Sequence, residues 1–400
     1  MQELNIPQKI TFIYTDIGRG HPFYLDGIKE ALIREKSLGL VRGQSSVFEL
    51  SRGLSLMAWK LVRKTYRLGA SDGLMGGVYS RLRHGADYNK PSRTLDILGS
   101  AIHRECRKLE GPIVVAHPIL VAVLKDRPGL IYQHGELAAP KEAVVKGAEY
   151  VFVPTEQAAE PFLSSGYSRD QVFVTGLCIE AGLVRQAEGV YASRLRRING
   201  QEPLTGAFFS SGAEPRTHVE KLVNAAGHAI ASSGRVIIFA FRNGLFQKRL
   251  VEALERWQTD FAVIDSSDYI PSDLPSALVV TYSNRRELDV FTDRLFGLFD
   301  YFVAPSHERT NWALGLGLPM FVVEPAYGPF APINASILYE SEVARSVDER
   351  GDSGFGKLLK DLRQHGYLSE MSENGWKKHC INGFRSAAKF FINYCGQKTL

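Results

Sequence analysis

Three histidines, His21, His117 and His134, each follow a short apolar run in the first half of the sequence. Such runs predict buried strands, and ligands of open parallel sheets bind beyond the carboxyl ends of the strands. A neutral imidazole at such a place can accept a proton during catalysis, although a buried or helix-capping histidine would show the same pattern. The spacing therefore predicts a general base, His21 first and His134 second, with the neighbouring Glu136 as a further candidate.

Glycines precede the first of these histidines in the segment Gly18-Arg19-Gly20-His21. Two glycines permit a tight turn and a close approach of the backbone to a ligand. The segment lacks the third glycine of the dinucleotide fingerprint GxGxxG, and no P-loop GK[ST] follows it. No histidine belongs to an HExxH metal-ligand spacing. We therefore expect no NAD, no ATP, no bound metal and no other cofactor.

Small residues follow the first predicted strand of the second half, in the segment Ser210-Ser211-Gly212-Ala213. They leave backbone N–H groups open toward an anion, so this loop predicts a phosphate site. Other polar and aromatic residues follow the later strands of the same half: Tyr282, Ser306, His307, Thr310, Asn311, Trp312, Glu324 and Asn334. Each loop alone could be an ordinary turn, and it is their succession that indicates a binding edge.

Short β-branched runs alternate with helical patterns along almost the whole chain, which is typical of βα units in a parallel sheet. The expected strands are 9–16, 46–50, 112–116, 129–133, 150–154 and 171–175, then 205–210, 235–241, 261–264, 277–282, 301–304 and 319–323. The alternation pauses after the sixth strand, where residues 180–203 indicate a helix followed by a linker. We therefore expect two Rossmann-like domains, 1–182 and 204–372, joined by this linker segment at 183–203. Apolar residues near a 3.6-residue period predict an amphipathic helix within 373–400.

The composition is that of an ordinary folded protein, with 400 residues of which 44% are hydrophobic and 23% charged. No apolar run reaches the ~18 residues of a membrane-spanning helix, and the amino-terminal segment does not follow the pattern of a secretory signal. The four cysteines have no paired CxxC spacing, which indicates reduced thiols rather than disulfides or a zinc site. These features predict a cytoplasmic protein.

Positive charge is concentrated between Arg52 and Lys108, where twelve basic residues outnumber four acidic ones. Within this segment, residues 54–68 place apolar side chains on one stripe and basic ones on the next, as in a helix at a membrane interface. Ordinary core helices also have one apolar face, and the charge excess favours the membrane interpretation. The residues expected at an anionic membrane surface are Trp59, Lys60, Arg63, Lys64 and Arg67. No nucleic-acid recognition motif accompanies the charge, so we expect no nucleic acid partner.

The order of the loops resembles the GT-B glycosyltransferases, in particular the branch of the monogalactosyldiacylglycerol synthases, the bacterial diacylglycerol glucosyltransferases and the lipid-linked N-acetylglucosaminyltransferase of peptidoglycan synthesis. The segments that carry the resemblance are a strand ending in Pro154-Thr155-Glu156, a strand ending in Val174-Thr175-Gly176, the run 313–319 and the pair Asn334-Ala335. The resemblance implies an α/β fold of the GT-B type. Two Rossmann-like open parallel-sheet domains would face a cleft, and a C-terminal helix would cross back to the first domain.

The resemblance also implies an inverting, metal-independent transfer of a sugar from a nucleotide-sugar, in the first place a UDP-sugar, to a lipid or membrane-associated acceptor. Gly18, Gly20 and His117 would bind the acceptor. The segment 210–212 and the eight polar and aromatic residues of the later loops would bind the donor. The protein would act as a peripheral protein at the inner face of the membrane.

Three segments depart from the pattern of that branch. Ser306-His307 stands where its members carry a glycine pair after the fifth strand. Trp312 stands where its members commonly carry a glutamate that holds the ribose of UDP, and Phe330-Ala331-Pro332 stands where they often carry Gln or Glu. An indole can stack on a base or a sugar but cannot accept hydrogen bonds from a ribose. Two alternatives therefore remain open: a catalytically silent GT-B relative that binds a nucleotide or lipid, and another sugar-nucleotide enzyme such as an epimerase.

Overall fold

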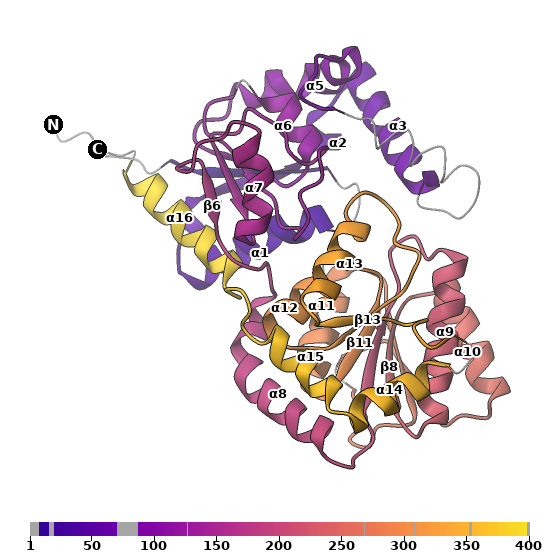
Figure 1. Ribbon diagram of the computed structural model, residues 1–400. Helices are drawn as coiled ribbons and strands as arrows, with labels where there is room; N and C mark the ends of the chain where they lie inside the picture. Colours follow the sequence, from indigo (N-terminus) through magenta and orange to yellow (C-terminus); the bar gives the residue numbers. More distant parts are fainter. Residues whose placement is uncertain are drawn as a thin grey trace. The chain divides into compact units, whose positions relative to one another are not determined.

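The computed structural model describes residues 8–15, 20–69, 87–125, 127–267, 269–307, 309–351 and 354–397 (Figure 1). The chain forms two compact units, and each is built on one parallel sheet. Among the described residues, unit 1 contains those up to Ala181 and those from His379 onward, and unit 2 contains Gly182–Lys378. Two α/β units with parallel sheets are what the alternation of strand and helix patterns predicts.

Unit 1 contains a six-stranded parallel sheet. In spatial order its strands are β2 (Val41–Ser46), β1 (Ile10–Tyr14), β3 (Ile113–Val115), β4 (Leu130–Gln133), β5 (Tyr150–Val153) and β6 (Val172–Val174). Its inner strands are continuous apolar runs because both faces of the sheet are covered.

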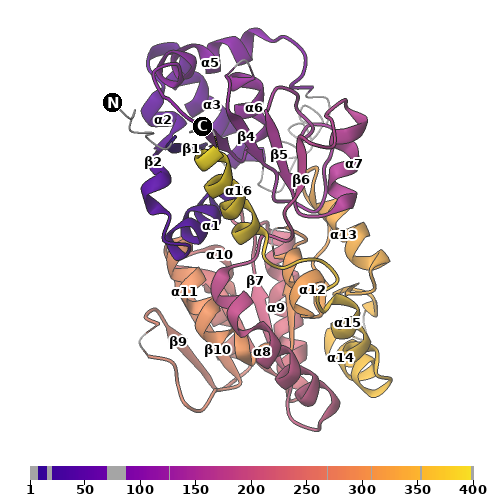
Figure 2. The same ribbon diagram turned by 90° about the vertical axis from the view of Figure 1, so that its left-hand side faces the viewer.

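Helices cover the two faces of this sheet (Figures 1 and 2). One face is covered by α3 (Gly53–Gly69), α5 (Arg93–Cys106), α6 (Pro118–Leu124) and α7 (Glu156–Ser164), and the other by α1 (Gly20–Arg34) and α16 (Gly383–Gln397). Side chains of β1 alternate accordingly, since Ile13 enters the core under α3 and α5, whereas Ile10 and Phe12 enter the core under α1 and α16.

The C-terminal helix belongs to unit 1, as the resemblance implies. Helix α16 lies beside α1 (Figure 2), and a Cβ added at Gly27 of α1 would lie 2.3 Å from the ring of Phe384. Arg385 of α16 also pairs with Glu35 at 2.6 Å. The apolar face of the tail therefore completes a core whose sheet lies more than two hundred residues earlier in the chain.

One expected strand, 46–50, is in fact helical. The side chain of Ser46 accepts a hydrogen bond from the Phe48 N–H, and the carboxylate of Glu49 accepts one from the Ser46 N–H. This reciprocal capping box starts α2 (Val47–Leu50). The strand lies directly before it, at 41–46, where a largely polar sequence suits the edge of the sheet.

Unit 2 contains a seven-stranded parallel sheet. In spatial order its strands are β13 (Ala344–Ser346), β12 (Met320–Val322), β11 (Tyr301–Ala304), β7 (Thr205–Phe209), β8 (Arg235–Phe241), β10 (Ala277–Tyr282) and β9 (Phe261–Ile264). Its helices are α8 (Ala181–Asn199), α9 (Arg216–Ala231), α10 (Leu245–Arg256), α11 (Arg285–Leu295), α12 (Thr310–Leu316), α13 (Ala331–Glu340), α14 (Gly354–Gln364) and α15 (Tyr367–Gly375). The edge strand β13 has only three residues and no apolar run, so the sequence pattern does not predict it.

The segment expected to be a linker, 183–203, is mostly part of α8. The helix is fixed by Arg194, a fully buried arginine whose guanidinium donates hydrogen bonds to the carbonyl oxygens of Phe299, Leu316 and Gly317. Burial lowers the pKa of Arg194 to about 9. The basic residues that suggest a solvated linker in the sequence thus include one that packs α8 into unit 2.

The segment 373–400 is expected to form one amphipathic helix, but its helix starts several residues after the first residues of the apolar pattern. Helix α15 ends at Gly375, and the indole of Trp376 stacks on Tyr191 of α8 with 4.1 Å between the ring centroids. Helix α16 starts only at Gly383. A single periodic pattern in the sequence is therefore divided between the two units.

Candidate functional site

The glycine-rich segment of unit 1 connects β1 to α1. Gly18 and Arg19 lie outside the described residues, as does the side chain of His21. The backbone of Gly20 and His21 forms the first turn of α1. His21 therefore follows the carboxyl end of β1, which is the place that the sequence predicts for it.

His117 caps a helix. It is buried, and its Nδ1 accepts a hydrogen bond of 3.1 Å from the N–H of Ile119 at the start of α6. Side chains at this position stabilise a helix by satisfying one of its first N–H groups. The ring of His117 thus has a structural role, and an acceptor-binding role for it is a prediction to be tested.

His134 lies in the interior of unit 1, with 2% of its surface exposed. Its Nε2 is 3.0 Å from the carbonyl oxygen of Ala138, and its Nδ1 is 3.3 Å from the hydroxyl of Tyr132. A carbonyl can only accept, so Nε2 of the neutral ring carries the proton and Nδ1 accepts from Tyr132. Burial raises the pKa of Tyr132, which keeps its hydroxyl a donor. A proton could be taken up by His134 only by breaking this arrangement.

Glu136 is a third candidate for the base. Its side chain is partly exposed, and its charge adds to burial in raising the pKa of Cys178. The loop passes α1 at Gly135, where an added Cβ would lie 2.2 Å from the ring of Tyr24. Gly135 thus lets the loop carry Glu136 closely past α1, the helix whose first turn contains His21.

The residues of α3 that are expected at a membrane surface differ in their burial. Trp59, expected at a membrane surface, is fully buried, and its Nε1 donates to the carbonyl oxygen of Leu98 at 3.1 Å. The guanidinium of Arg63 lies 4.2 Å from the ring centroid of Phe48. Lys60 and Lys64 are exposed, as expected, and the side chain of Arg67 lies outside the described part of the chain.

The exposed side of α3 is apolar. Leu54, Met57 and Leu61 are 74%, 67% and 64% exposed, and they follow one another at helical spacing. We call these three residues the α3 row. A helix whose apolar residues point outward beside lysines is amphipathic in the sense of an interfacial helix. No helix of the described chain has the length and apolarity needed to cross a bilayer.

In unit 2, the loop 210–213 follows β7, and its Gly212 is exposed. Ser210 is buried, and its hydroxyl donates to Glu214, whose carboxylate also accepts from the N–H of Phe246 at 3.2 Å. Phe246 lies in the first turn of α10, a helix whose N-cap residue supplies no side-chain hydrogen bond. A protein carboxylate thus occupies the amino end of α10, which would otherwise suit a phosphate. The sequence analysis missed Glu214.

Trp312 belongs to the core of unit 2. Its indole is 2% exposed and packs against the rings of Phe209, Phe296 and Phe302 at centroid distances of 5.6–5.7 Å. It does not offer the stacking surface for a ligand that the sequence suggests. The guanidinium of the neighbouring Arg309, which the sequence analysis also missed, lies over the rings of Phe209 and Trp312.

Ser306 and Asn334, both predicted to bind the donor, lie in contact. The hydroxyl of Ser306 donates to the carbonyl of Ala331 at 2.8 Å, and the Asn334 amide donates to the carbonyl of Ser306 at 3.1 Å. Both side chains are buried, so they hold the start of α13 against the end of β11. Thr310 and Asn311 are buried in the first turn of α12, and His307 is partly exposed.

Tyr282 is the last residue of β10, and Glu324 follows β12 in the same sheet. The carboxylate of Glu324 accepts hydrogen bonds from the hydroxyls of Tyr339 and Ser346 at 3.2 and 3.1 Å. Burial, with the charge of Glu324, raises the pKa of Tyr339. Tyr282 is buried and meets the ring of Phe241 edge to face. Both predicted donor residues thus also have local structural partners.

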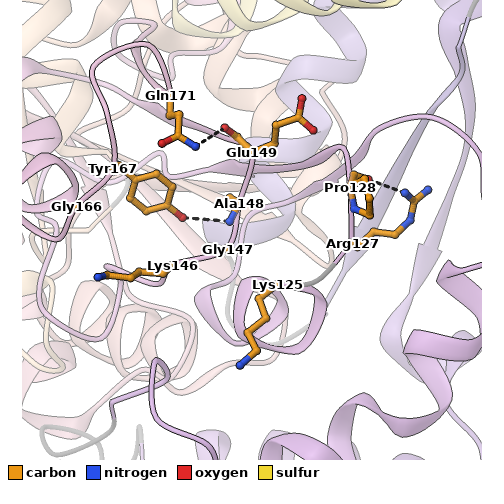
Figure 3. Close-up of a pocket in the computed structure, with 10 residues that line it drawn as sticks. All are labelled: Lys125, Arg127, Pro128, Lys146, Gly147, Ala148, Glu149, Gly166, Tyr167 and Gln171. Carbon is orange, nitrogen blue, oxygen red and sulfur yellow. Dashed lines mark hydrogen bonds between the residues drawn. The ribbon is translucent and has the colours of Figure 1, made fainter.

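A cavity of about 450 Å³ lies at the opposite, amino-terminal edge of the unit 1 sheet (Figure 3). Lys125, Arg127 and Lys146 line it together with Glu149. The guanidinium of Arg127 donates to backbone carbonyls, and Glu149 accepts hydrogen bonds from the Gly129 N–H and the Tyr394 hydroxyl. No residue predicted to be functional lines this cavity. In the described part of the chain, no three His, Cys, Asp or Glu side chains gather closely enough to hold a metal ion.

No protein-family model matches the chain, and no curated protein sequence matches it. Several solved structures are similar to it in fold. A UDP-GlcNAc 2-epimerase from Neisseria meningitidis bound to UDP-GlcNAc is 12% identical, with a TM-score of 0.54, over 98% of this chain and 100% of that one. The S. aureus protein MnaA, in a co-structure with UDP, is 12% identical with a TM-score of 0.55 over 98% and 96% of the two chains.

A plant structure is equally similar. The Medicago truncatula protein UGT71G1, complexed with UDP-glucose, is 10% identical with a TM-score of 0.55 over 99% of this chain and 100% of that one. At such identities the likeness concerns the fold. The chain has the GT-B fold: two parallel-sheet α/β units, with a C-terminal helix that returns to the first.

Proposed function

We propose that the protein is an inverting, metal-independent glycosyltransferase that moves a sugar from a UDP-sugar to a lipid acceptor at an anionic membrane surface. The donor is assigned to unit 2 and the acceptor to unit 1. The donor assignment is supported by the fold, because the similar structures hold UDP, UDP-GlcNAc and UDP-glucose.

The observation that carries the lipid acceptor is the α3 row. Leu54, Met57 and Leu61 expose apolar side chains on a helix that also presents Lys60 and Lys64 to solvent. Apolar side chains gain free energy by entering the boundary between headgroups and acyl chains, and each lysine near an anionic surface adds roughly 1 kcal/mol. Trp59 ties the helix to unit 1 from its buried side. An acceptor that is itself a lipid would then meet unit 1 in the membrane surface.

The proposed chemistry is a single displacement. A bond forms between the acceptor oxygen and the anomeric carbon, the bond from that carbon to the diphosphate breaks, and the acceptor proton passes to a base of unit 1. His21 is the first candidate for the base because it follows β1 directly, and Glu136 is the second because it is partly exposed. His134 is third, because its ring nitrogens lie close to groups of the interior.

A second function, epimerisation of a UDP-sugar, is favoured by one observation. Two of the similar structures, with TM-scores of 0.54 and 0.51, are UDP-GlcNAc 2-epimerases, from Neisseria meningitidis and from Methanocaldococcus jannaschii. Epimerisation needs no acceptor, so the two functions differ in whether a lipid is required.

The test is to incubate the full chain with radiolabelled UDP-glucose or UDP-GlcNAc, with and without vesicles of anionic phospholipid that contain diacylglycerol. Transfer predicts label in the organic phase only when vesicles are present, and less of it in a variant with Leu54→Ser, Met57→Ser and Leu61→Ser. Interconversion of the free UDP-sugar without vesicles would establish the epimerase instead. Binding of UDP without either reaction would establish the silent relative.

A further inference from the structure

The cavity at the amino-terminal edge of the unit 1 sheet gathers positive charge away from the residues predicted to be functional. Its volume of about 450 Å³ lies in the range of small-molecule sites. The described residues that line it include three cations, Lys125, Arg127 and Lys146, against one carboxylate, Glu149. Asp126 is adjacent in the sequence and lies outside the described residues, and the cations outnumber the carboxylates even when it is counted. The cavity therefore favours an anion.

Two of these charged side chains are already engaged by the protein. Glu149 accepts hydrogen bonds from the Gly129 N–H at 2.8 Å and from the Tyr394 hydroxyl at 3.0 Å. The guanidinium of Arg127 donates to backbone carbonyl groups, which are those of Cys106, Leu109, Gly111 and Pro128. Arg127 and Glu149 thus build the wall of the cavity, and Arg127 adds positive charge to it.

The two lysines are the cations that remain for a ligand. Both are exposed, and neither ammonium group forms a hydrogen bond or an ion pair with a residue of the described ranges. A Cβ added at Gly147 would lie 2.4 Å from the Cβ of Lys125, so the backbone directly after Lys146 touches Lys125. A Cβ added at Gly166 would lie 3.6 Å from the Nζ of Lys146. The two glycines therefore bring both lysines to one cavity (Figure 3).

The backbone that carries Lys146 is held in place by side chains of other segments. Its N–H donates to the Oδ1 of Asn89 at 2.8 Å. The buried hydroxyl of Tyr167 accepts from the Ala148 N–H at 3.1 Å (Figure 3) and donates to the carbonyl of Val145 at 2.8 Å. A loop fixed on both sides of Lys146 loses little conformational freedom when a ligand binds.

We propose that this cavity binds a small anion that carries phosphate groups, through the ammonium groups of Lys125 and Lys146. A planar carboxylate is matched best by the fork of an arginine, but the donors of Arg127 are used by carbonyl groups. An ammonium is a point charge with rotatable donors, which suits the oxygens of a phosphate. The site is separate from the transfer reaction proposed above and does not depend on it.

The first test is calorimetric titration of the full chain with inorganic pyrophosphate in the presence of excess UDP. The wild type is compared with the double variant Lys125→Met, Lys146→Met, with the double variant Lys125→Arg, Lys146→Arg, and with a control. The control is Lys357→Met, Lys360→Met, which removes two exposed lysines of α14 in unit 2. We expect the first variant to raise the Kd at least about tenfold, because charged hydrogen bonds are lost. The arginine variant should keep most of the affinity, and the control should match the wild type.

The second test uses only the wild type and is independent of how the variants fold. Exposed lysines are acetylated with acetic anhydride, with and without pyrophosphate, and the modified residues are identified by mass spectrometry. Bound pyrophosphate should slow the acetylation of Lys125 and Lys146 and leave that of Lys357 and Lys360 unchanged. Protection by glycerol phosphate would identify a soluble phosphate ester as the ligand, and protection only by vesicles of phosphatidic acid would identify a lipid headgroup.

Two results would overturn the proposal. The first is an unchanged Kd for pyrophosphate in a folded Lys125→Met, Lys146→Met protein, with thermal unfolding as the check of folding. The second is pyrophosphate binding that protects neither lysine from acetylation, because the anion would then lie elsewhere. Both results would leave the proposed function standing, since the donor is assigned to unit 2.

Discussion

Polar side chains at the carboxyl edges of the two sheets meet different kinds of neighbour. In unit 1, His117 and His134 direct ring nitrogens to backbone groups of their own surroundings, at 3.1 Å from Ile119 and 3.0 Å from Ala138. In unit 2, the guanidinium carbon of Arg309 lies 4.4 Å from the ring centroid of Phe209. The difference teaches that a position after a strand does not by itself identify a residue that meets a ligand, because the direction of its hydrogen-bonding atoms decides.

The largest effect on activity is expected at His21, which follows a strand of the unit 1 sheet and would meet the acceptor. Replacing His21 by Ala should lower transfer by about 10²–10⁴-fold, because a general base is lost, and should leave the Kd of UDP unchanged, because the donor is assigned to unit 2. Turnover at saturating UDP-sugar and calorimetry with UDP measure the two quantities. The variant Glu136→Gln is measured beside it, and a residue whose variant keeps wild-type turnover is excluded as the base.

The next largest effect concerns Trp312 as a core residue. Trp312→Ala should lower the free energy of unfolding by about 3–5 kcal/mol, since a large buried ring is removed from among Phe209, Phe296 and Phe302. Urea denaturation measures the change. Trp257 of the same unit is 39% exposed, so Trp257→Ala should lower the free energy of unfolding by less than Trp312→Ala does. If Trp312→Ala were fully stable but unable to bind UDP, the indole would be a ligand contact after all.

A smaller effect is expected from the lysines beside the α3 row. Replacing Lys60 and Lys64 by Ser should weaken the free energy of binding to anionic vesicles by about 2 kcal/mol at low salt. The loss should be smaller at high salt, because surface charges are screened. Sedimentation of the protein with the vesicles measures the binding. The control replaces Lys357 and Lys360 by Ser, two exposed lysines of α14 in unit 2. Equal loss of binding in the two double variants would show that total charge, and not the α3 surface, governs the attraction.

The smallest effect on stability is expected at His117, where two variants can distinguish helix capping from acceptor binding. His117→Ala should lower the free energy of unfolding by about 0.5–2 kcal/mol, and His117→Asn should restore most of it, because asparagine caps helices well. Chemical denaturation and transfer are measured on both variants. A stable His117→Asn protein that has lost transfer would show that the ring also meets the acceptor.

Much of the fold can be predicted from the sequence because it is encoded locally. Apolar runs such as 235–241 and 277–282 coincide with β8 and β10. The prediction fails where a local signal was given too little weight, as at Ser46 and Glu49, whose spacing of three residues is that of a capping box. It also fails at β13, since a three-residue edge strand buries too little apolar surface to leave a pattern.

The candidate site is less predictable than the fold. Ser306 and Asn334 are predicted to bind a donor, and the hydrogen bonds that they form in the structure hold α13 in place. Glu214 and Arg309 belong to no motif. The groups that they contact, the Phe246 N–H and the Phe209 ring, lie in other elements of the unit. A single sequence shows which residue types follow a strand, and it does not show which of their atoms neighbouring elements will engage.

The sequence by itself determined the alternation of strands and helices, the two parallel sheets and the amphipathic character of α3 and α16, because periods of two and 3.6 residues are properties of the chain alone. Only the tertiary structure decided which side of α3 faces inward, so that Trp59 is buried and Leu54 is exposed. Periodicity defines the faces of an element but not the neighbour that each face meets. That choice is made when segments distant in the chain pack into one core, as when Phe209 and Trp312 come together beneath Arg309.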